Sequence, residues 1–138
     1  MKKREPVSHI MTKQVITMQS TDTLQDVVAV LKANPIRHLP VLSGGKIAGM
    51  ISSNDVNRLT FGKLFDNQDK IDEALLEMLT IDQIMTHKVV SVSSDTSIRE
   101  VAELFAEAEF HAVPVVDDTF LVGIITTTDV IRYMLAQY

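Results

Sequence analysis

The stretch Gly49-Met50-Ile51-Ser52-Ser53-Asn54-Asp55 occurs a second time, 74 positions later, as Gly123-Ile124-Ile125-Thr126-Thr127-Thr128-Asp129. Each copy has a glycine, two apolar residues, a hydroxyl residue, and an aspartate three positions after that hydroxyl residue. Apolar residues at helical spacing follow the aspartate in both copies. The stretch therefore predicts a strand that turns directly into a helix.

The same offset relates most of the chain to itself without a gap. Ile10-Met11-Thr12 corresponds to Ile84-Met85-Thr86, and Pro40-Val41 corresponds to Pro114-Val115. Between residues 10 and 58, 13 of 49 positions are identical to those 74 positions later. Such self-similarity indicates a tandem duplication. Function is therefore to be sought in what the two copies form together.

Composition narrows the class of protein. A chain of 138 residues with 46% apolar and 22% charged residues is typical of a globular domain, or of two small halves that share a core. A net charge of −5 argues against a nucleic-acid backbone as the main partner. No apolar run reaches membrane-span length, and Glu5-Pro6 stands where a signal peptide would be apolar. We expect a cytoplasmic location. The absence of cysteine excludes disulfides and thiolate catalysis.

Each copy predicts a β-α-β-β-α unit, hence an α/β (α+β) fold. A one-turn helix (6–11, 80–85) precedes a short strand (15–18, 89–92) and then a capped helix, which begins at Thr23 or Ser97. Apolar residues recur along this helix at helical spacing and predict one apolar stripe against a core: Leu24, Val27, Val28 and Leu31, or Ile98, Val101, Ala102 and Phe105. Pro40 and Pro114 mark a strand edge or start, because proline cannot donate to a ladder. The turn residues Ser43-Gly44-Gly45-Lys46 and Asp117-Asp118-Thr119 predict hairpins into the strands 47–51 and 120–125. The predicted domains are 6–65 and 80–138, joined by a helical connector, 66–79, that Asp69 can cap.

Two interpretations of the duplicated stretch remain open. Ser52-x-x-Asp55 and Thr126-x-x-Asp129 are both capping boxes, each contributing about 1 kcal/mol of local stability. The same residues at the positive end of a helix also offer donors to a phosphate and a carboxylate to two ribose hydroxyls. The segments at Pro40 and Pro114 could supply an apolar slot with free backbone groups for a purine.

The ordered set of motifs resembles the cystathionine β-synthase (CBS) domain, and two in tandem resemble a CBS pair, or Bateman module. The motifs are Ile-Met-Thr, a valine-rich strand, Thr-Leu-x-x-Val or Ser-Ile-x-x-Val, then Arg37-His38-Leu39-Pro40-Val41 or His111-Ala112-Val113-Pro114-Val115, then Gly-apolar-apolar-[Ser/Thr]-x-x-Asp. The resemblance covers residues 6–138. It implies sheets packed about a pseudo-twofold axis, with two clefts that bind adenosine-containing regulatory ligands.

The resemblance also implies which residues share a cleft, since the aspartate of one copy faces the segment before the proline of the other. The first cleft would combine Asp129, Thr126 and Thr128 with Val15, Ile16, Ile36, Arg37, His38 and Pro40. The second would combine Asp55, Ser52 and Asn54 with Val89, Val90, Phe110, His111, Ala112 and Pro114.

The two clefts differ in charge. Arg37 and His38 stand where phosphates would lie in the first, whereas the second offers His111 and Ala112. We therefore expect tighter binding of phosphorylated ligand in the Asp129 cleft. A solvated loop charge is an equally simple interpretation of Arg37 and His38. Arg58 and Arg132, three residues after each aspartate, are explained by helix-surface ion pairs.

The implied ligand is AMP, ADP or ATP, with S-adenosylmethionine and NAD less favoured. No histidine spacing suits a metal, Asp117-Asp118 is a turn, and no nucleophile stands beside a base. We therefore expect no catalytic or metal site. The leading hypothesis is a stand-alone regulatory homodimer that acts on another protein. The alternatives are a structural or oligomerisation module with vestigial clefts and, less favoured, a nucleotide hydrolase.

Overall fold

The computed structural model describes residues 4–59 and 73–138, with the side chains of 73–75 left out. The chain forms two compact units of mixed α and β structure. One unit is Ile16–Lys88, and the other joins the residues up to Val15 to Val89–Tyr138. We describe each unit by itself.

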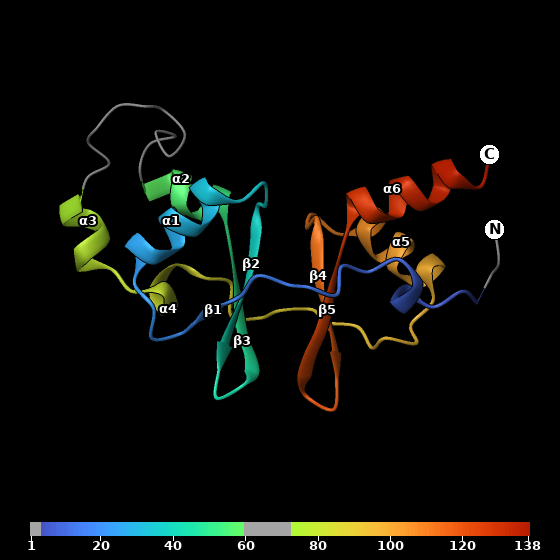
Figure 1. The fold of residues 1–138 in the computed structure, drawn as a ribbon, viewed down its shortest axis with the longest axis horizontal. Helices are drawn as coiled ribbons and strands as arrows, with labels where there is room; N and C mark the ends of the chain where they lie inside the picture. Colours follow the sequence, from blue (N-terminus) through green and yellow to red (C-terminus); the bar gives the residue numbers. More distant parts are fainter. Residues whose placement is uncertain (1–3, 60–72) are drawn as a thin grey trace. The chain divides into compact units, whose positions relative to one another are not determined.

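The Ile16–Lys88 unit contains a hairpin with helices packed against it (Figure 1). Its elements are β1 Met18–Gln19, α1 Leu24–Ala33, β2 His38–Ser43, β3 Lys46–Ser52, α2 Ser53–Leu59, α3 Glu73–Met78 and α4 Ile81–Ile84. Strand β1 pairs parallel with β2, and β2 pairs antiparallel with β3. Helix α3 lies within the predicted connector, 66–79, whereas the predicted cap, Asp69, lies outside the described residues.

The second unit repeats this plan. Its elements are the 3₁₀ turn η1 Val7–His9, α5 Ile98–Glu107, β4 Ala112–Asp117, β5 Phe120–Thr126 and α6 Thr127–Ala136. Strands β4 and β5 form an antiparallel hairpin (Figure 1). Val92 makes a single parallel bridge to Val115 beside it.

The apolar stripes predicted from helical spacing contribute to the hydrophobic cores of the two units. In the first, Leu24, Val27, Val28 and Leu31 of α1 are buried in one cluster with strand residues Leu39, Val41 and Ile51. In the second, Ile98 and Val101 of α5 join Val113, Val115 and Ile125. The spacing of apolar residues thus places α1 and α5 against their own hairpins.

Side-chain caps begin the helices where the sequence predicts them. Thr23 and Asp26 form a reciprocal capping box at α1, and Ser97 accepts from the Glu100 N–H at α5. The hydrogen bond from the Thr23 backbone N–H lowers the pKa of Asp26 below its ordinary value. The carboxylate of this cap therefore stays ionised to a lower pH than an ordinary aspartate does.

The first strand of each copy is shorter than predicted. The 15–18 prediction is wrong in extent, since β1 is Met18–Gln19, and from 89–92 only the Val92 bridge forms. Met18 pairs with Val41, so continuing the parallel ladder backwards would place Thr17 opposite Pro40. Proline has no N–H to donate there. Proline therefore ends the pairing on that side of β2.

The boundaries of the compact units differ from those of the sequence copies, because the segment that begins each copy belongs to the unit of the other copy. Thr12, from the start of the chain, exchanges two backbone hydrogen bonds of 2.9 Å with Ile124 of β5. Thr86 does the same with Met50 of β3, at 2.9 and 3.0 Å. Each Ile-Met-Thr segment thus packs on the hairpin of the other copy.

Candidate functional site

The duplicated stretch forms a closed capping box at the start of α6. The Thr126 N–H donates to Asp129 Oδ2 at 2.9 Å, and the Asp129 N–H donates to Thr126 Oγ1 at 3.2 Å. Because β5 ends at Thr126, the strand turns directly into the helix. The prediction of a cap at this position is confirmed.

The first copy has the same box with an additional hydrogen bond. Asp55 Oδ2 accepts from the Ser52 N–H at 2.8 Å and from the Ser52 hydroxyl at 3.0 Å, and the Asp55 N–H donates to Ser52 Oγ at 3.2 Å. Both aspartates are half-buried.

The two copies differ in the partner of the second carboxylate oxygen, Oδ1, of each aspartate. The Arg58 guanidinium donates to Asp55 Oδ1 at 2.5 Å, so both Asp55 oxygens are engaged. Within 4–59 and 76–138, Asp129 Oδ1 has no hydrogen-bond partner and Arg132 makes no ion pair. The predicted ion pair is thus confirmed for Arg58 and is not found for Arg132.

The segment before each proline lies beside the capping box of its own copy. The Ser53 N–H donates to the Arg37 carbonyl at 2.9 Å, and His38 pairs with Ser52 across the β2–β3 hairpin. In the other unit, the Thr127 N–H donates to the His111 carbonyl at 3.0 Å. The first N–H of each helix is therefore satisfied by backbone and is not free for a ligand.

The remaining predicted site residues differ in accessibility. Pro40 and Pro114 are buried in β2 and β4, whereas Arg37, His111, Asn54 and Thr128 are exposed. His38, Ala112 and Phe110 are half-buried, and the Phe110 ring meets Phe105 edge to face with centroids 6.2 Å apart. Val15, Ile36 and Val89 are half-buried, and Ile16 and Val90 are exposed. That residues of both copies combine into shared clefts stays a prediction.

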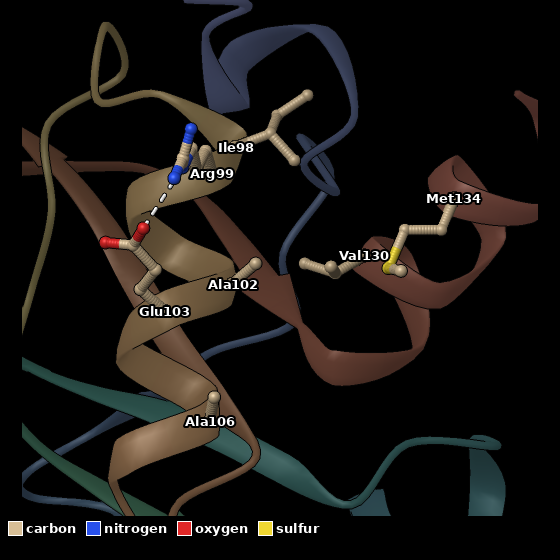
Figure 2. A pocket seen from close by; sticks show the side chains of 7 residues that line it. All are labelled: Ile98, Arg99, Ala102, Glu103, Ala106, Val130 and Met134. Carbon is tan, nitrogen blue, oxygen red and sulfur yellow. Dashed lines mark hydrogen bonds and ion pairs between the residues drawn. The ribbon is translucent and has the colours of Figure 1, made fainter. Parts of the chain in front are cut away.

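A groove that the sequence did not single out lies between α5 and α6 (Figure 2). Its volume is about 240 Å³, and its lining is almost wholly apolar. The lining residues are Ile98, Arg99, Ala102, Glu103, Ala106, Val130 and Met134. Arg99 and Glu103 pair with each other at 3.1 Å. None of the predicted site residues lines this groove. The only sequence signal for it is the helical spacing of apolar residues along α5 and α6.

The described residues contain neither a metal-type cluster nor a membrane-spanning helix. No cluster of three or more histidine, cysteine, aspartate or glutamate side chains is placed to hold a metal ion there. None of the helices in the described part of the chain is long and apolar enough to cross a membrane.

The fold and the site define a duplicated α+β module in which the last strand of each copy turns into a helix through a hydroxyl-x-x-aspartate box. The family model for the CBS domain matches residues 7–61 and 81–136. The chain therefore belongs to the CBS domain family, and the resemblance inferred from its motifs is confirmed.

Relatives and solved structures support the same assignment. The uncharacterized protein MJ0188 of Methanocaldococcus jannaschii is 33% identical over 132 residues, which are 95% of this chain and 44% of that protein. The crystal structure of MJ1225 from the same organism superposes with a TM-score of 0.82 at 27% identity, covering 97% of this chain and 49% of that one. This chain thus spans about half the length of MJ0188 and MJ1225.

A third comparison includes bound ligands. The CBS domain pair of protein MJ0100, solved in complex with 5′-methylthioadenosine and S-adenosyl-L-methionine, superposes with a TM-score of 0.76 at 30% identity. The match covers 96% of this chain and 98% of that one. The likeness therefore extends over an entire CBS pair.

Proposed function

We propose that this chain is a regulatory, non-catalytic module that binds an adenosine-containing ligand. The observation that carries the proposal is the Asp129 carboxylate, which keeps one oxygen without a partner among the described residues, at the start of α6. A ribose hydroxyl can donate to that oxygen. The ligands of the MJ0100 pair, both adenosine derivatives, support this class of ligand.

The proposed roles follow from the chemistry of each side chain. Asp129 accepts from the ribose, while Thr126 and Thr128 stand at the positive end of a ten-residue helix. Arg37 is exposed and makes no ion pair within the described residues, so its charge is available to a phosphate. We retain the prediction that the adenine lies near the buried prolines, in clefts to which both copies contribute.

Among adenosine ligands, we propose AMP, ADP or ATP first, because Arg37 and His38 suit a phosphate. S-adenosylmethionine, 5′-methylthioadenosine and NAD share the adenosine moiety and remain candidates. The open Asp129 oxygen adds a second reason to expect tighter binding at Asp129 than at Asp55, where both oxygens are engaged.

The test is a thermal-shift and calorimetry panel with AMP, ADP, ATP, NAD, S-adenosylmethionine and 5′-methylthioadenosine. A ligand at about 100 times its Kd adds about 2.7 kcal/mol to the free energy of unfolding, hence a shift of several degrees in Tm. We expect Asp129→Ala to abolish most of the shift given by the ligand that binds.

The matched control is Asp26→Ala, which opens a capping box of the same geometry outside the proposed sites. It should lower the unliganded Tm slightly, because the box at α1 loses its carboxylate, and leave the ligand shift intact. Equal ligand shifts in both variants would contradict a ligand role for Asp129.

A second candidate function is a structural or interaction module in which the aspartates only cap helices. The closed boxes at Ser52 and Thr126 favour it, since caps alone account for those hydrogen bonds. The absence of any ligand shift in the whole panel would favour this function over the first. Product formation from a nucleotide, lost in Asp129→Ala, would instead indicate a hydrolase.

We also propose that the module acts on a separate partner protein in the cytoplasm as a homodimer. Helix α6 supports self-association, because Ile131, Met134 and Leu135 expose large apolar side chains on it. Sedimentation velocity over a range of concentrations measures the dimer directly, and a monomer at all concentrations would contradict it.

A further inference from the structure

We infer that Arg58 closes the site at Asp55 by occupying the carboxylate that a ligand's ribose would use. This inference rests on the proposed function and concerns the regulation of one of its two sites. Arg58 would act as an internal competitor, so the first-copy site opens only when its guanidinium moves away.

The contacts of Asp55 leave no oxygen unengaged. Ser52 donates twice to Oδ2, and the Arg58 Nη2 group donates to Oδ1. A second, weaker contact holds the arginine in place, since its Nε donates to the Asn54 carbonyl at 3.4 Å. A carboxylate has about four acceptor positions, and the three hydrogen bonds to Asp55 leave one, on Oδ1. Two ribose hydroxyls need two acceptor positions, so a ligand that donates both hydroxyls to Asp55 has to displace Arg58.

The accessibility of the pair indicates that this displacement is feasible. The Arg58 side chain is 76% exposed, whereas that of Asp55 is 11% exposed. The arginine can therefore swing into solvent without breaking core packing, while the aspartate stays in its box. An exposed ion pair of this kind alters a competing equilibrium by about two- to fivefold.

The second copy provides an internal comparison. Arg132 occupies the equivalent position three residues after Asp129, yet no ion pair joins them in the part of the chain that the structure describes. Asp129 Oδ1 remains open while Asp55 Oδ1 is taken. The same two residue types at the same spacing thus give one closed carboxylate and one open carboxylate.

Adenosine is the probe for the test, because it is the uncharged moiety that the candidate ligands share. A phosphate could attract the displaced Arg58 and obscure the competition, whereas adenosine has no charge to do so. The amide resonances of Asp55 and Asp129 in an NMR titration report the two sites separately.

We expect Arg58→Gln to tighten adenosine binding at Asp55 by about two- to fivefold. Arg132→Gln is the matched control and should leave the Kd at Asp129 unchanged. Adding Asp55→Asn to Arg58→Gln should cancel the gain. Raising the salt concentration should also tighten binding at Asp55 in the wild type, because salt screens the exposed ion pair.

An unchanged or weaker Kd at Asp55 in Arg58→Gln overturns the inference, as does an equal gain from Arg132→Gln at Asp129. In those outcomes the wild type still binds adenosine, and the proposed function stands. If neither site binds adenosine in the wild type or in any variant, and the nucleotide panel is also silent, the proposed function and the inference fail together.

Discussion

At the scale of single residues, the two hairpin turns show how the copies have diverged. Gly44 and Gly45 turn the first hairpin with φ values of 59° and 82°. Their counterparts Asp118 and Thr119 adopt φ values of 50° and 72°. A β-branched residue at positive φ is strained by about 1–3 kcal/mol, whereas glycine adopts this region freely. The second turn therefore stores strain that the first does not.

Replacing Thr119 by glycine should relieve this strain. After subtracting the entropy that glycine loses on folding, we expect a gain of about 1 kcal/mol in the free energy of unfolding. Urea denaturation measures it. The reciprocal change, Gly45→Thr, should lower the free energy of unfolding by about 1–3 kcal/mol. A lower midpoint for Thr119→Gly would show that its backbone conformation carries no strain.

At the scale of elements, a glycine in the last strand of each hairpin admits the segment from the other copy. A Cβ at Gly123 would lie 2.6 Å from Met11 Sδ and 2.9 Å from the Thr12 carbonyl oxygen. The Thr12 backbone cannot retreat without losing its two hydrogen bonds to Ile124. Close approach of backbone to backbone, rather than a special φ, therefore requires glycine at this position.

Gly123→Ala should accordingly destabilise the protein by about 1–3 kcal/mol, the usual cost of overpacking a close contact. Thermal or urea unfolding measures the change. Gly44→Asn is a suitable control, because no atom lies within 4 Å of a Cβ there and asparagine tolerates positive φ. A Gly123→Ala variant within about 0.5 kcal/mol of wild type would mean that Met11 and Thr12 yield easily.

At the scale of the whole molecule, each compact unit depends on a segment from the other copy. Val7 is fully buried among second-copy residues, and its N–H donates to the Thr96 carbonyl at 2.8 Å. Tyr133 of α6 donates its hydroxyl to Glu5 at 2.8 Å. Ile81, the counterpart of Val7, is fully buried in the core of the first-copy hairpin. Neither sequence copy completes a core with its own residues alone.

Because the copies exchange segments, each contributing one to the core of the other, a substitution in such a segment should destabilise the other copy's hairpin and helices. Val7→Ala should lower amide protection against hydrogen exchange in α5, β4, β5 and α6, although Val7 is far from them in sequence. Ile81→Ala should lower it in α1, β2 and β3, with a cost of about 2–5 kcal/mol. Loss of protection confined to the 16–88 unit in Val7→Ala would contradict the exchange.

Features that depend on neighbours within a few residues were predictable from the sequence. The capping boxes at Thr23 and Thr126 and the apolar stripe from Leu24 to Leu31 all formed as expected. The two predicted hairpins also formed, because caps, apolar stripes and turns depend on local spacing and backbone preference. The duplication and the ordered motifs likewise identify the family without the tertiary structure.

The tertiary structure alone decided the features that depend on long-range packing and on which rotamer a side chain takes. An offset of 74 residues does not say on which hairpin Ile10-Met11-Thr12 packs, since both copies present the same glycine. Strand β1 is short because Pro40 has no N–H to donate to the residue opposite it in the parallel ladder. Arg58 and Arg132 are indistinguishable by spacing, yet among the described residues only Arg58 pairs with its aspartate, because spacing does not determine the rotamer of an exposed side chain.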